Sequence, residues 1–120
     1  MKSYKDLEIY NLSFEYAIKV HKMTLKLPKY ELYETGSQLR RSSKSVVNNI
    51  AEGYGRRKYK GDFVRFLIYS QASLLESTTQ LEMIKEIHML DGVDEVINNS
   101  KKLGAKIYSF INYVENNWKT

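Results

Sequence analysis

Apolar residues recur at intervals of three and four along four segments of this sequence, and no segment shows the sustained alternation of a strand. The most regular segment runs from Leu32 to Ile50 with an unbroken 4-3-4-3-4 spacing. One Pro and six Gly leave little material for the turns of a β architecture. The spacing is that of helices packed against one another through one side, so the sequence predicts an all-α protein.

The apolar stripes of the four predicted helices differ in composition. In the second stripe, Gly36 and Ser43 lower the helix propensity, which predicts that a neighbouring helix approaches closely there. The stripe residues are Leu7, Tyr10, Phe14, Ala17, Ile18, His21 and Leu25; then Leu32, Gly36, Leu39, Ser43, Val46 and Ile50; then Phe63, Leu67, Ser70, Leu74, Ser77, Leu81, Ile84 and His88, widened by Phe66, Ser73 and Ile87; and last Val93, Val96, Ile97, Ser100, Leu103, Ile107, Phe110, Ile111, Val114 and Trp118.

Short connections separate these segments. Pro28 cannot continue a helix interior, so it divides the first segment from the second. Gly53 and Gly55 are expected to end the second helix through the left-handed conformation, and Asp91-Gly92 indicates the last turn. Four long helices with short connections pack as antiparallel neighbours. The sequence therefore predicts one antiparallel up-down-up-down four-helix bundle that spans residues 1–120 as a single domain.

The composition narrows the function classes. The chain has no Cys, which excludes disulfides and thiolate metal sites and fits a cytoplasmic location. It opens without an apolar leader, and no stretch approaches the roughly 20 apolar residues of a membrane span. The formal net charge of +5 suits an anionic partner. A charge of this size governs solubility and encounter rather than specificity.

Residues for catalysis or metal binding are scarce. His21 and His88 are the two imidazoles, they fall on different predicted helices, and neither has the Glu-x-x-His or His-x-x-x-His companion of a bundle metal site. No serine lies in a G-x-S-x-G elbow, and Ser42-Ser43-Lys44-Ser45 is no triad because adjacent helical residues face different directions. We therefore expect no enzyme, no catalytic residue, no metal and no cofactor.

The polar side of the second segment carries amide, hydroxyl and charged residues at helical spacing. One interpretation is a hydrogen-bonded network that includes Glu76 of the third helix, with Arg40 or Arg41 as its partner. The other is a solvated face or a contact face toward another copy of the chain. The residues assigned to this structural or subunit-contact network are Gln38, Arg40, Arg41, Ser45, Asn49, Glu52 and Glu76.

Residues 56–60 are the one place where a single charge sign is concentrated. Cations neutralise phosphates, and tyrosine rings can stack on unpaired bases, so this loop is a candidate contact for RNA or DNA. The alternative is a soluble helix connection whose lysines oppose aggregation. The candidate nucleic-acid-binding residues are Arg56, Arg57, Lys58, Lys60, Tyr54 and Tyr59.

A set of residues between positions 32 and 76 carries a resemblance to a known family. Over about residues 5 to 117, the chain resembles the small bacterial four-helix bundle proteins encoded in intervening sequences of 23S ribosomal RNA genes. The accessory protein of diversity-generating retroelements is similar to that family. The residues that carry the resemblance are Leu32, Gln38-Leu39-Arg40-Arg41, Ser45, Asn49-Ile50-Ala51-Glu52-Gly53, Arg65-Phe66-Leu67 and Ser73-Leu74-Leu75-Glu76.

The resemblance implies a bundle that assembles as a ring-like homopentamer and has no enzymatic activity. Its retroelement branch implies a basic protein that binds a reverse transcriptase and nucleic acid. This sequence departs from the family pattern at Ser42 and Ser43, where small apolar residues are usual, and at Lys58-Tyr59-Lys60, where Ser or Thr commonly opens the helix. Two hypotheses follow. One is an oligomeric scaffold that contacts nucleic acid or a nucleoprotein through its basic loop, and the other is a purely protein-binding oligomer.

Overall fold

The computed structural model describes residues 3–119, and four long helices account for most of them. No strand occurs within this range, so the all-α prediction is confirmed. The long helices are α1 (Glu8–Thr24), α3 (Thr35–Gly55), α4 (Lys60–His88) and α5 (Val93–Asn117). A short 3-10 turn, η1 (Tyr4–Asp6), precedes them, and the four-residue helix α2 (Lys29–Leu32) lies between α1 and α3.

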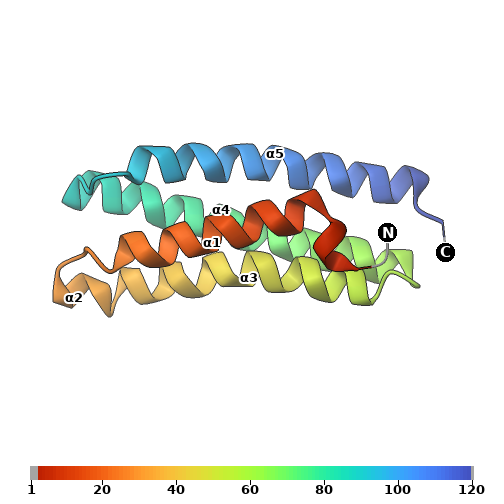
Figure 1. The fold of residues 1–120 in the computed structure, drawn as a ribbon, viewed down its shortest axis with the longest axis horizontal. Helices are drawn as coiled ribbons and strands as arrows, with labels where there is room; N and C mark the ends of the chain where they lie inside the picture. The colour runs from red at the N-terminus through yellow and green to blue at the C-terminus, as the bar shows by residue number, and fades with distance from the viewer. Residues whose placement is uncertain (1–2, 120) are drawn as a thin grey trace.

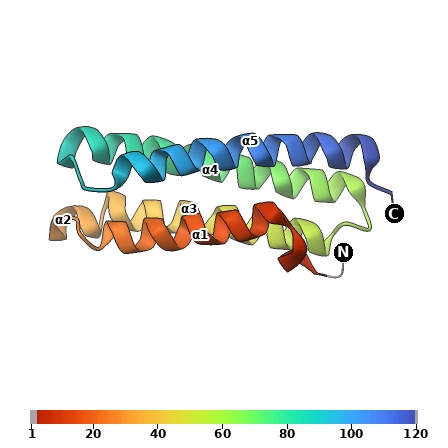
Figure 2. The same cartoon turned by 45° about the horizontal axis from the view of Figure 1, so that its top comes forward.

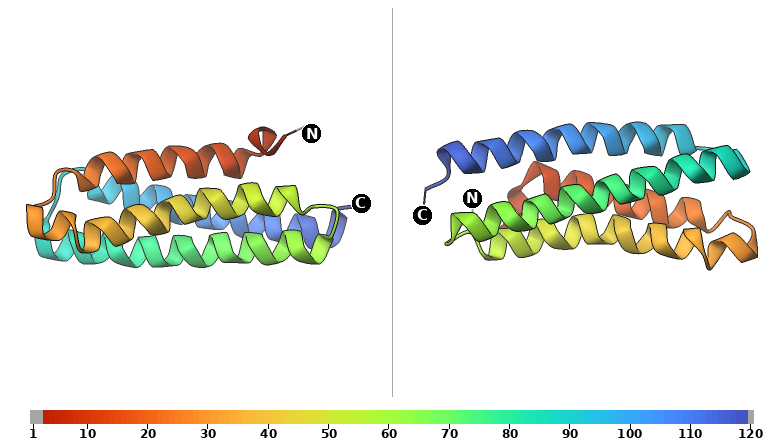
Figure 3. Two further views of the ribbon diagram at one scale, coloured as in Figure 1. Left: turned by 90° about the horizontal axis from the view of Figure 1, so that it is seen from below. Right: turned by 180° about the vertical axis from the view of Figure 1, so that it is seen from behind.

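The long helices lie side by side in a rod of 48 × 21 × 20 Å. Figures 1 and 2 show that α2 and the α4–α5 turn lie at one end of the rod. The α3–α4 turn, η1 and the last turn of α5 lie at the other. Helix α3 packs against α1 and α4, and α5 packs against α4 and α1 (Figure 3). This cycle of contacts encloses one core.

Different residues determine where the helices begin and end. Pro28 precedes α2, and Leu32 belongs to this short helix rather than to α3. Helix α4 ends at His88 because Met89 adopts the left-handed conformation, with φ of 49°. Gly92, with φ of 84°, opens α5 and needs the freedom of glycine. The turn predicted at Asp91-Gly92 is therefore confirmed.

Gly53 and Gly55 lie inside α3 and not in the left-handed conformation expected for them. Among the described residues, Gly92 is the glycine with a positive φ. Gly53 instead permits close packing, because a Cβ there would lie 3.1 Å from the Cβ of Phe66 and 3.3 Å from Cδ1 of Phe63. The close approach predicted at Gly36 is found as well, because a Cβ there would lie 3.0 Å from the Glu31 carbonyl oxygen of α2.

The core agrees with the predicted stripes of α4 and α5, except that Ile87 of α4 is 62% exposed, and it differs from the predicted stripe of α1. Phe14, Ile18 and Leu25, which the spacing placed in the core, are 49%, 43% and 58% exposed. Tyr16 is buried instead, together with Val20 and Met23 on the same side of α1. The Tyr16 hydroxyl lies 2.7 Å from the Ser77 hydroxyl, and burial raises the pKa of Tyr16 to about 12. Helix α1 therefore has apolar residues on two sides. The predicted stripe followed the exposed side and left out the buried residues Tyr16, Val20 and Met23.

Candidate functional site

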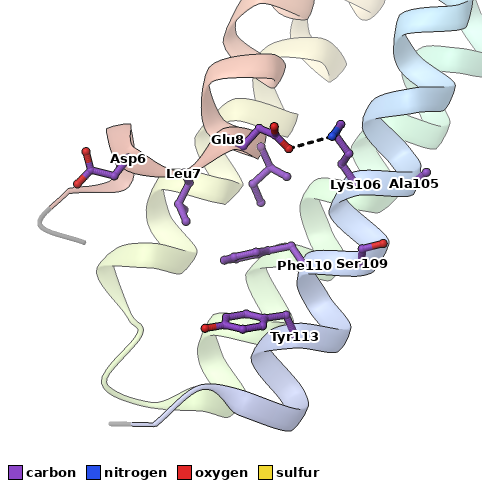
Figure 4. A pocket seen from close by; sticks show the side chains of 9 residues that line it. Asp6, Leu7, Glu8, Ala105, Lys106, Ser109, Phe110 and Tyr113 are labelled. Carbon is purple, nitrogen blue, oxygen red and sulfur yellow. Dashed lines mark hydrogen bonds and ion pairs between the residues drawn. The ribbon is translucent and has the colours of Figure 1, made fainter.

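A cleft of about 480 Å³ separates the N-terminal turn from α5 (Figure 4). Glu8 of α1 and Lys106 of α5 pair across it, with 3.0 Å between Oε1 and Nζ. Both side chains are largely exposed, which is not the desolvated environment that tunes a catalytic group. Across residues 3–119, no three His, Asp or Glu side chains come together in a way that could hold a metal ion.

The two histidines lie in different environments. His88 at the end of α4 faces Glu31 of α2, with 3.1 Å between Nε2 and Oε2, and both side chains are about nine-tenths buried. The hydrogen bonds with Thr35 and then with His88 hold the pKa of Glu31 below its usual value. His21 lines a groove between α1 and α3. The fold therefore uses His88 as a structural partner and does not bring the imidazoles together.

Arg40 joins α3 to the α1–α2 region. Its Nη1 donates to the Thr24 hydroxyl at 2.9 Å, and its Nη2 donates to the Leu32 carbonyl at 2.9 Å. Glu76, which was expected to pair with an arginine of α3, is exposed on α4 and accepts a hydrogen bond from Gln80 at 3.3 Å. The predicted ion pair with Arg40 or Arg41 is not found among the described residues. Glu76 instead contacts Gln80, whose side-chain oxygen accepts a hydrogen bond from Ser42 of α3.

Hydroxyl groups make the polar contacts between α3 and α4. The hydroxyls of Ser45 and Ser73 lie 2.8 Å apart, and the Asn49 amide donates to the Ser45 carbonyl at 2.9 Å. Ser42 donates to the Gln80 side chain at 2.8 Å, a contact that the sequence interpretation missed. The sequence feature that could have indicated this contact is the position of Ser42, a small polar residue one turn before Ser45 on the same side of the helix. The remaining predicted network residues, Gln38, Arg41 and Glu52, are exposed.

The turn between α3 and α4 holds both of its arginines over aromatic rings. The guanidinium carbon of Arg57 lies 4.1 Å from the centre of the Tyr54 ring, and its Nη1 donates to the Tyr54 carbonyl at 3.0 Å. Arg56 lies 4.4 Å from the centre of the Phe66 ring. Such cation–π contacts restrict a long side chain. Both guanidinium groups are thus positioned while their residues remain exposed.

The two tyrosines of the turn have different exposure. Tyr54 is 4% exposed, lies edge-on to Phe63, and is covered by Arg57. A buried ring is not accessible to a base, so this fold does not support the expected stacking role of Tyr54. Tyr59 is 64% exposed directly before α4. Of the two candidate stacking residues, Tyr59 is the accessible one.

Further cations surround the turn. Lys60 donates from Nζ to the Glu115 carbonyl at 3.1 Å and so joins the turn to α5. Lys119, which follows α5, lines a cleft with Arg57 and Lys58. No local sequence pattern could place Lys119 here, because the topology brings it to the turn. We call the exposed cations Arg56, Arg57, Lys58, Lys60, Arg65 and Lys119 the basic end.

The side of α4 that faces away from the core carries large apolar residues among its charged ones. We define the α4 outer stripe as Ile68, Leu75, Met83 and Ile87, which are between 48% and 66% exposed. Bundle helices usually turn polar residues outward. Between α1 and α3 lies a second apolar surface, a groove of about 420 Å³ that we call the α1–α3 groove. Its lining residues are Phe14, Ala17, Ile18, His21, Lys44, Val47 and Asn48.

Comparison with known proteins places this bundle in a family. The profile of the family described as 23S rRNA-intervening sequence protein matches residues 5–115. The chain belongs to this family. Its fold is similar to the crystal structure of a protein with unknown function from the S23 ribosomal protein family of Bacteroides thetaiotaomicron VPI-5482. The TM-score is 0.73 at 20% sequence identity, with 86% of this chain and 97% of that chain covered.

Membership of the 23S rRNA-intervening sequence protein family confirms the resemblance on which the sequence interpretation relied. The structural likeness, at 20% identity, concerns the fold alone. A comparison with curated proteins found no match. In the described part of the chain, no helix is long and apolar enough to cross a membrane. The similarity to retroelement accessory proteins and the homopentamer stay predictions.

Proposed function

We propose that the chain is a non-catalytic, cytoplasmic scaffold, built as an antiparallel up-down-up-down bundle, that contacts nucleic acid or a nucleoprotein through its basic end. The observation that supports this proposal is the charge of the α3–α4 turn. Residues 54–65 contain five cations and a single carboxylate, Asp62, which pairs with Arg65 at 3.1 Å. Lys119 adds a further cation from the other end of the sequence.

The chemistry of the basic end favours a polyanion. Phosphate contacts release condensed counterions, so binding that uses about four cations would weaken with salt at a logarithmic slope of about −3 to −4. Arg56 and Arg57 are held over rings and lose less conformational freedom on binding than unrestrained side chains would. Tyr59 can add stacking on an unpaired base.

The test compares two variants with the same change in net charge. In the first, Arg56→Gln, Arg57→Gln, Lys58→Gln and Lys60→Gln neutralise the turn. In the control, Gln replaces four exposed lysines elsewhere, namely Lys26, Lys29, Lys101 and Lys102. Fluorescence anisotropy with labelled RNA and DNA is measured over a range of salt concentrations, after thermal melts have shown that both variants fold.

We expect the turn variant to lose at least about tenfold in affinity and to show a flatter salt dependence, because its phosphate contacts are gone. The control should retain both. Equal loss in the two variants would mean that net charge, and not the basic end, governs binding. Unchanged binding by the turn variant would contradict the proposal.

The second candidate function, a structural oligomer, is favoured by the two apolar surfaces. The exposed apolar side chains of the α4 outer stripe, which we call the ridge, and the α1–α3 groove are formed by different helices. Exposed Glu76, Glu82 and Glu86 border the ridge, whereas Lys44 lines the groove. We propose that the groove of one copy receives the ridge of the next. Such a head-to-tail contact closes into a ring when the rotation permits, and five subunits is the number that the family resemblance implies.

Light scattering tests this second candidate. Leu75→Glu places a charge in the centre of the ridge and should lower the molar mass of the assembly toward that of a monomer. Tyr108→Glu, on the exposed side of α5, is the matched control and should leave the assembly intact. A wild-type protein that is a monomer at its highest soluble concentration would contradict self-association. If the immobilised protein retained a reverse transcriptase even after nuclease treatment, the partner would be a protein and not nucleic acid.

A further inference from the structure

A cleft of about 350 Å³ lies between the α3–α4 turn and the residues that follow α5. Its volume is at the lower end of the range for pockets that take small ligands. Three of its lining residues are cations, one is an indole, and no described carboxylate lines it. The lining residues are Gly55, Arg57, Lys58, Trp118 and Lys119.

The turn side of the cleft is fixed by contacts within the fold. The Arg57 guanidinium lies on the Tyr54 ring at 4.1 Å and donates to the Tyr54 carbonyl. Lys60 donates to the Glu115 carbonyl in the last turn of α5, which holds the two sides of the cleft together. A Cβ on Gly55 would meet no atom within 4 Å, so the cleft is open beside this residue.

Trp118 lines the opposite side of the cleft. Its backbone N–H donates to the Val114 carbonyl at 3.2 Å, which continues the helical hydrogen-bonding pattern. Its ring lies nearly perpendicular to Phe63, with 5.1 Å between ring centres. The indole is thus anchored to the core while Trp118 retains partial exposure at the cleft.

We propose that this cleft binds one unpaired nucleotide of a nucleic-acid strand, with the phosphate between Arg57, Lys58 and Lys119 and the base against Trp118. Cations alone would accept any anion, whereas an indole beside them adds a flat apolar surface that suits a base. A duplex keeps its bases stacked inside the helix, and a cleft of about 350 Å³ admits one nucleotide only. This inference rests on the proposed contact between the basic end and nucleic acid.

Trp118 is the one tryptophan of the sequence, so its emission reports on the cleft directly. The full chain is titrated with a terminally phosphorylated single-stranded oligonucleotide, a blunt duplex of the same sequence, adenosine monophosphate and inorganic phosphate. Anisotropy of the labelled oligonucleotides is followed in parallel. We expect the single strand to quench Trp118 over the same concentration range in which its anisotropy rises. The duplex should bind without quenching, and phosphate should compete without quenching.

Variants at the rim of the cleft supply the second measurement. Lys119→Gln should lower the affinity for the single strand by about tenfold and that for the duplex by clearly less, because only the single strand places a phosphate inside the cleft. Trp118→Leu should lower the affinity for the single strand and leave the affinity for the duplex unchanged, because only an unpaired base can lie against the indole. Lys26→Gln, at the opposite end of the bundle, is the control and should change neither affinity.

The outcomes separate this inference from the proposed function. If the single strand binds by anisotropy but leaves Trp118 emission unchanged, the nucleotide cleft is wrong while the basic end stands. Equal loss of single-strand and duplex affinity in Lys119→Gln would lead to the same conclusion. If neither oligonucleotide binds, both proposals are wrong. Adenosine monophosphate that matches the oligonucleotide in affinity would assign the cleft to free nucleotides and overturn the role for a strand.

Discussion

Glu31 and His88 form a contact between positions 57 residues apart in the sequence. Glu31 lies on the short helix α2, and His88 closes α4 at the same end of the bundle. Tyr30 packs beside the imidazole, with 6.1 Å between ring centres. The pair thereby fixes the connection between α1 and α3 onto the end of α4, and it does so from a buried position in which water screens it little.

Replacing Glu31 with Gln tests how much this contact stabilises the fold. At pH 7 we expect the free energy of unfolding to fall by about 1–3 kcal/mol, because a buried charge-assisted hydrogen bond is lost. The folded pKa of Glu31 is lowered, so its contribution is complete above the unfolded value of about 4.3 and disappears as pH falls through the folded pKa. Wild type and variant should therefore converge in urea titrations at an acidic pH below the folded pKa. Glu34→Gln, an exposed neighbour, should change little at either pH.

Gly53 and Gly55 allow a second residue-level comparison. Gly53→Ala should destabilise the fold by about 1–3 kcal/mol, because its Cβ would press on Phe66 and Phe63. Gly55→Ala has open space and should stabilise the helix by up to about 1 kcal/mol. Chemical denaturation measures both. A Gly53→Ala protein as stable as wild type would show that α3 and α4 can separate without cost.

Residue types were predicted more reliably from the sequence than residue partners were. Spacing identified Arg40 and Ser45 as polar contacts of α3, but it could not show that Arg40 reaches Thr24 rather than Glu76. A partner depends on how neighbouring helices are rotated and offset, which no single helix encodes. Lys119 joins the basic end for the same reason, through topology and not through local pattern.

At the scale of helices, the seam between α3 and α4 depends on small residues. Ser70 is fully buried and donates to the Val46 carbonyl at 2.7 Å. Ser70→Ala keeps the volume nearly unchanged and should cost about 1 kcal/mol for the lost hydrogen bond. Ser70→Leu overfills the seam and should cost more, in the upper part of the range of about 1–3 kcal/mol.

Denaturant titration distinguishes these two effects. The midpoint should fall further for Ser70→Leu than for Ser70→Ala, with an unchanged slope if both variants keep the native fold. Ser109→Leu, on the exposed side of α5, controls for the added apolar surface and should leave the midpoint in place. Equal midpoints for the two Ser70 variants would show that the seam can widen to accept a larger side chain.

The number and extent of the long helices followed from spacing, whereas the inner side of α1 did not. For α4, the predicted stripe from Phe63 to Ile84 is buried, although apolar residues such as Ile68 and Leu75 also lie on its exposed side. In α1, the residues Phe14 and Ile18 form an equally regular stripe that the fold leaves exposed. Apolar residues on either side of a helix recur at the same three-residue and four-residue intervals. The spacing alone therefore could not show which side of α1 is buried. The exposed side of α1 is the one that forms the α1–α3 groove.

At the scale of the whole molecule, positive and negative charges gather on different parts of the surface. The basic end gathers cations around the α3–α4 turn, whereas three glutamates and the ion-paired Lys85 lie along α4 from Ile68 to Ile87. The α1–α3 groove has Lys44 in its lining and an exposed Lys22 one turn beyond Ile18. A second copy that docks its ridge in this groove would therefore place acidic residues beside basic ones, which favours one orientation of assembly.

Charge reversal across this contact is the sharpest test of such an assembly. Glu82→Lys alone, or Lys44→Glu alone, should weaken self-association by about fivefold to tenfold, because each places like charges together. Combining both changes restores opposite charges and should recover most of the wild-type molar mass in light scattering. Because both residues are exposed in a single copy, monomer stability should stay within about 0.5 kcal/mol of wild type. If the losses of self-association in the two single variants simply add in the double variant, the two residues do not face each other. The ridge-in-groove arrangement would then be wrong even if the protein is an oligomer.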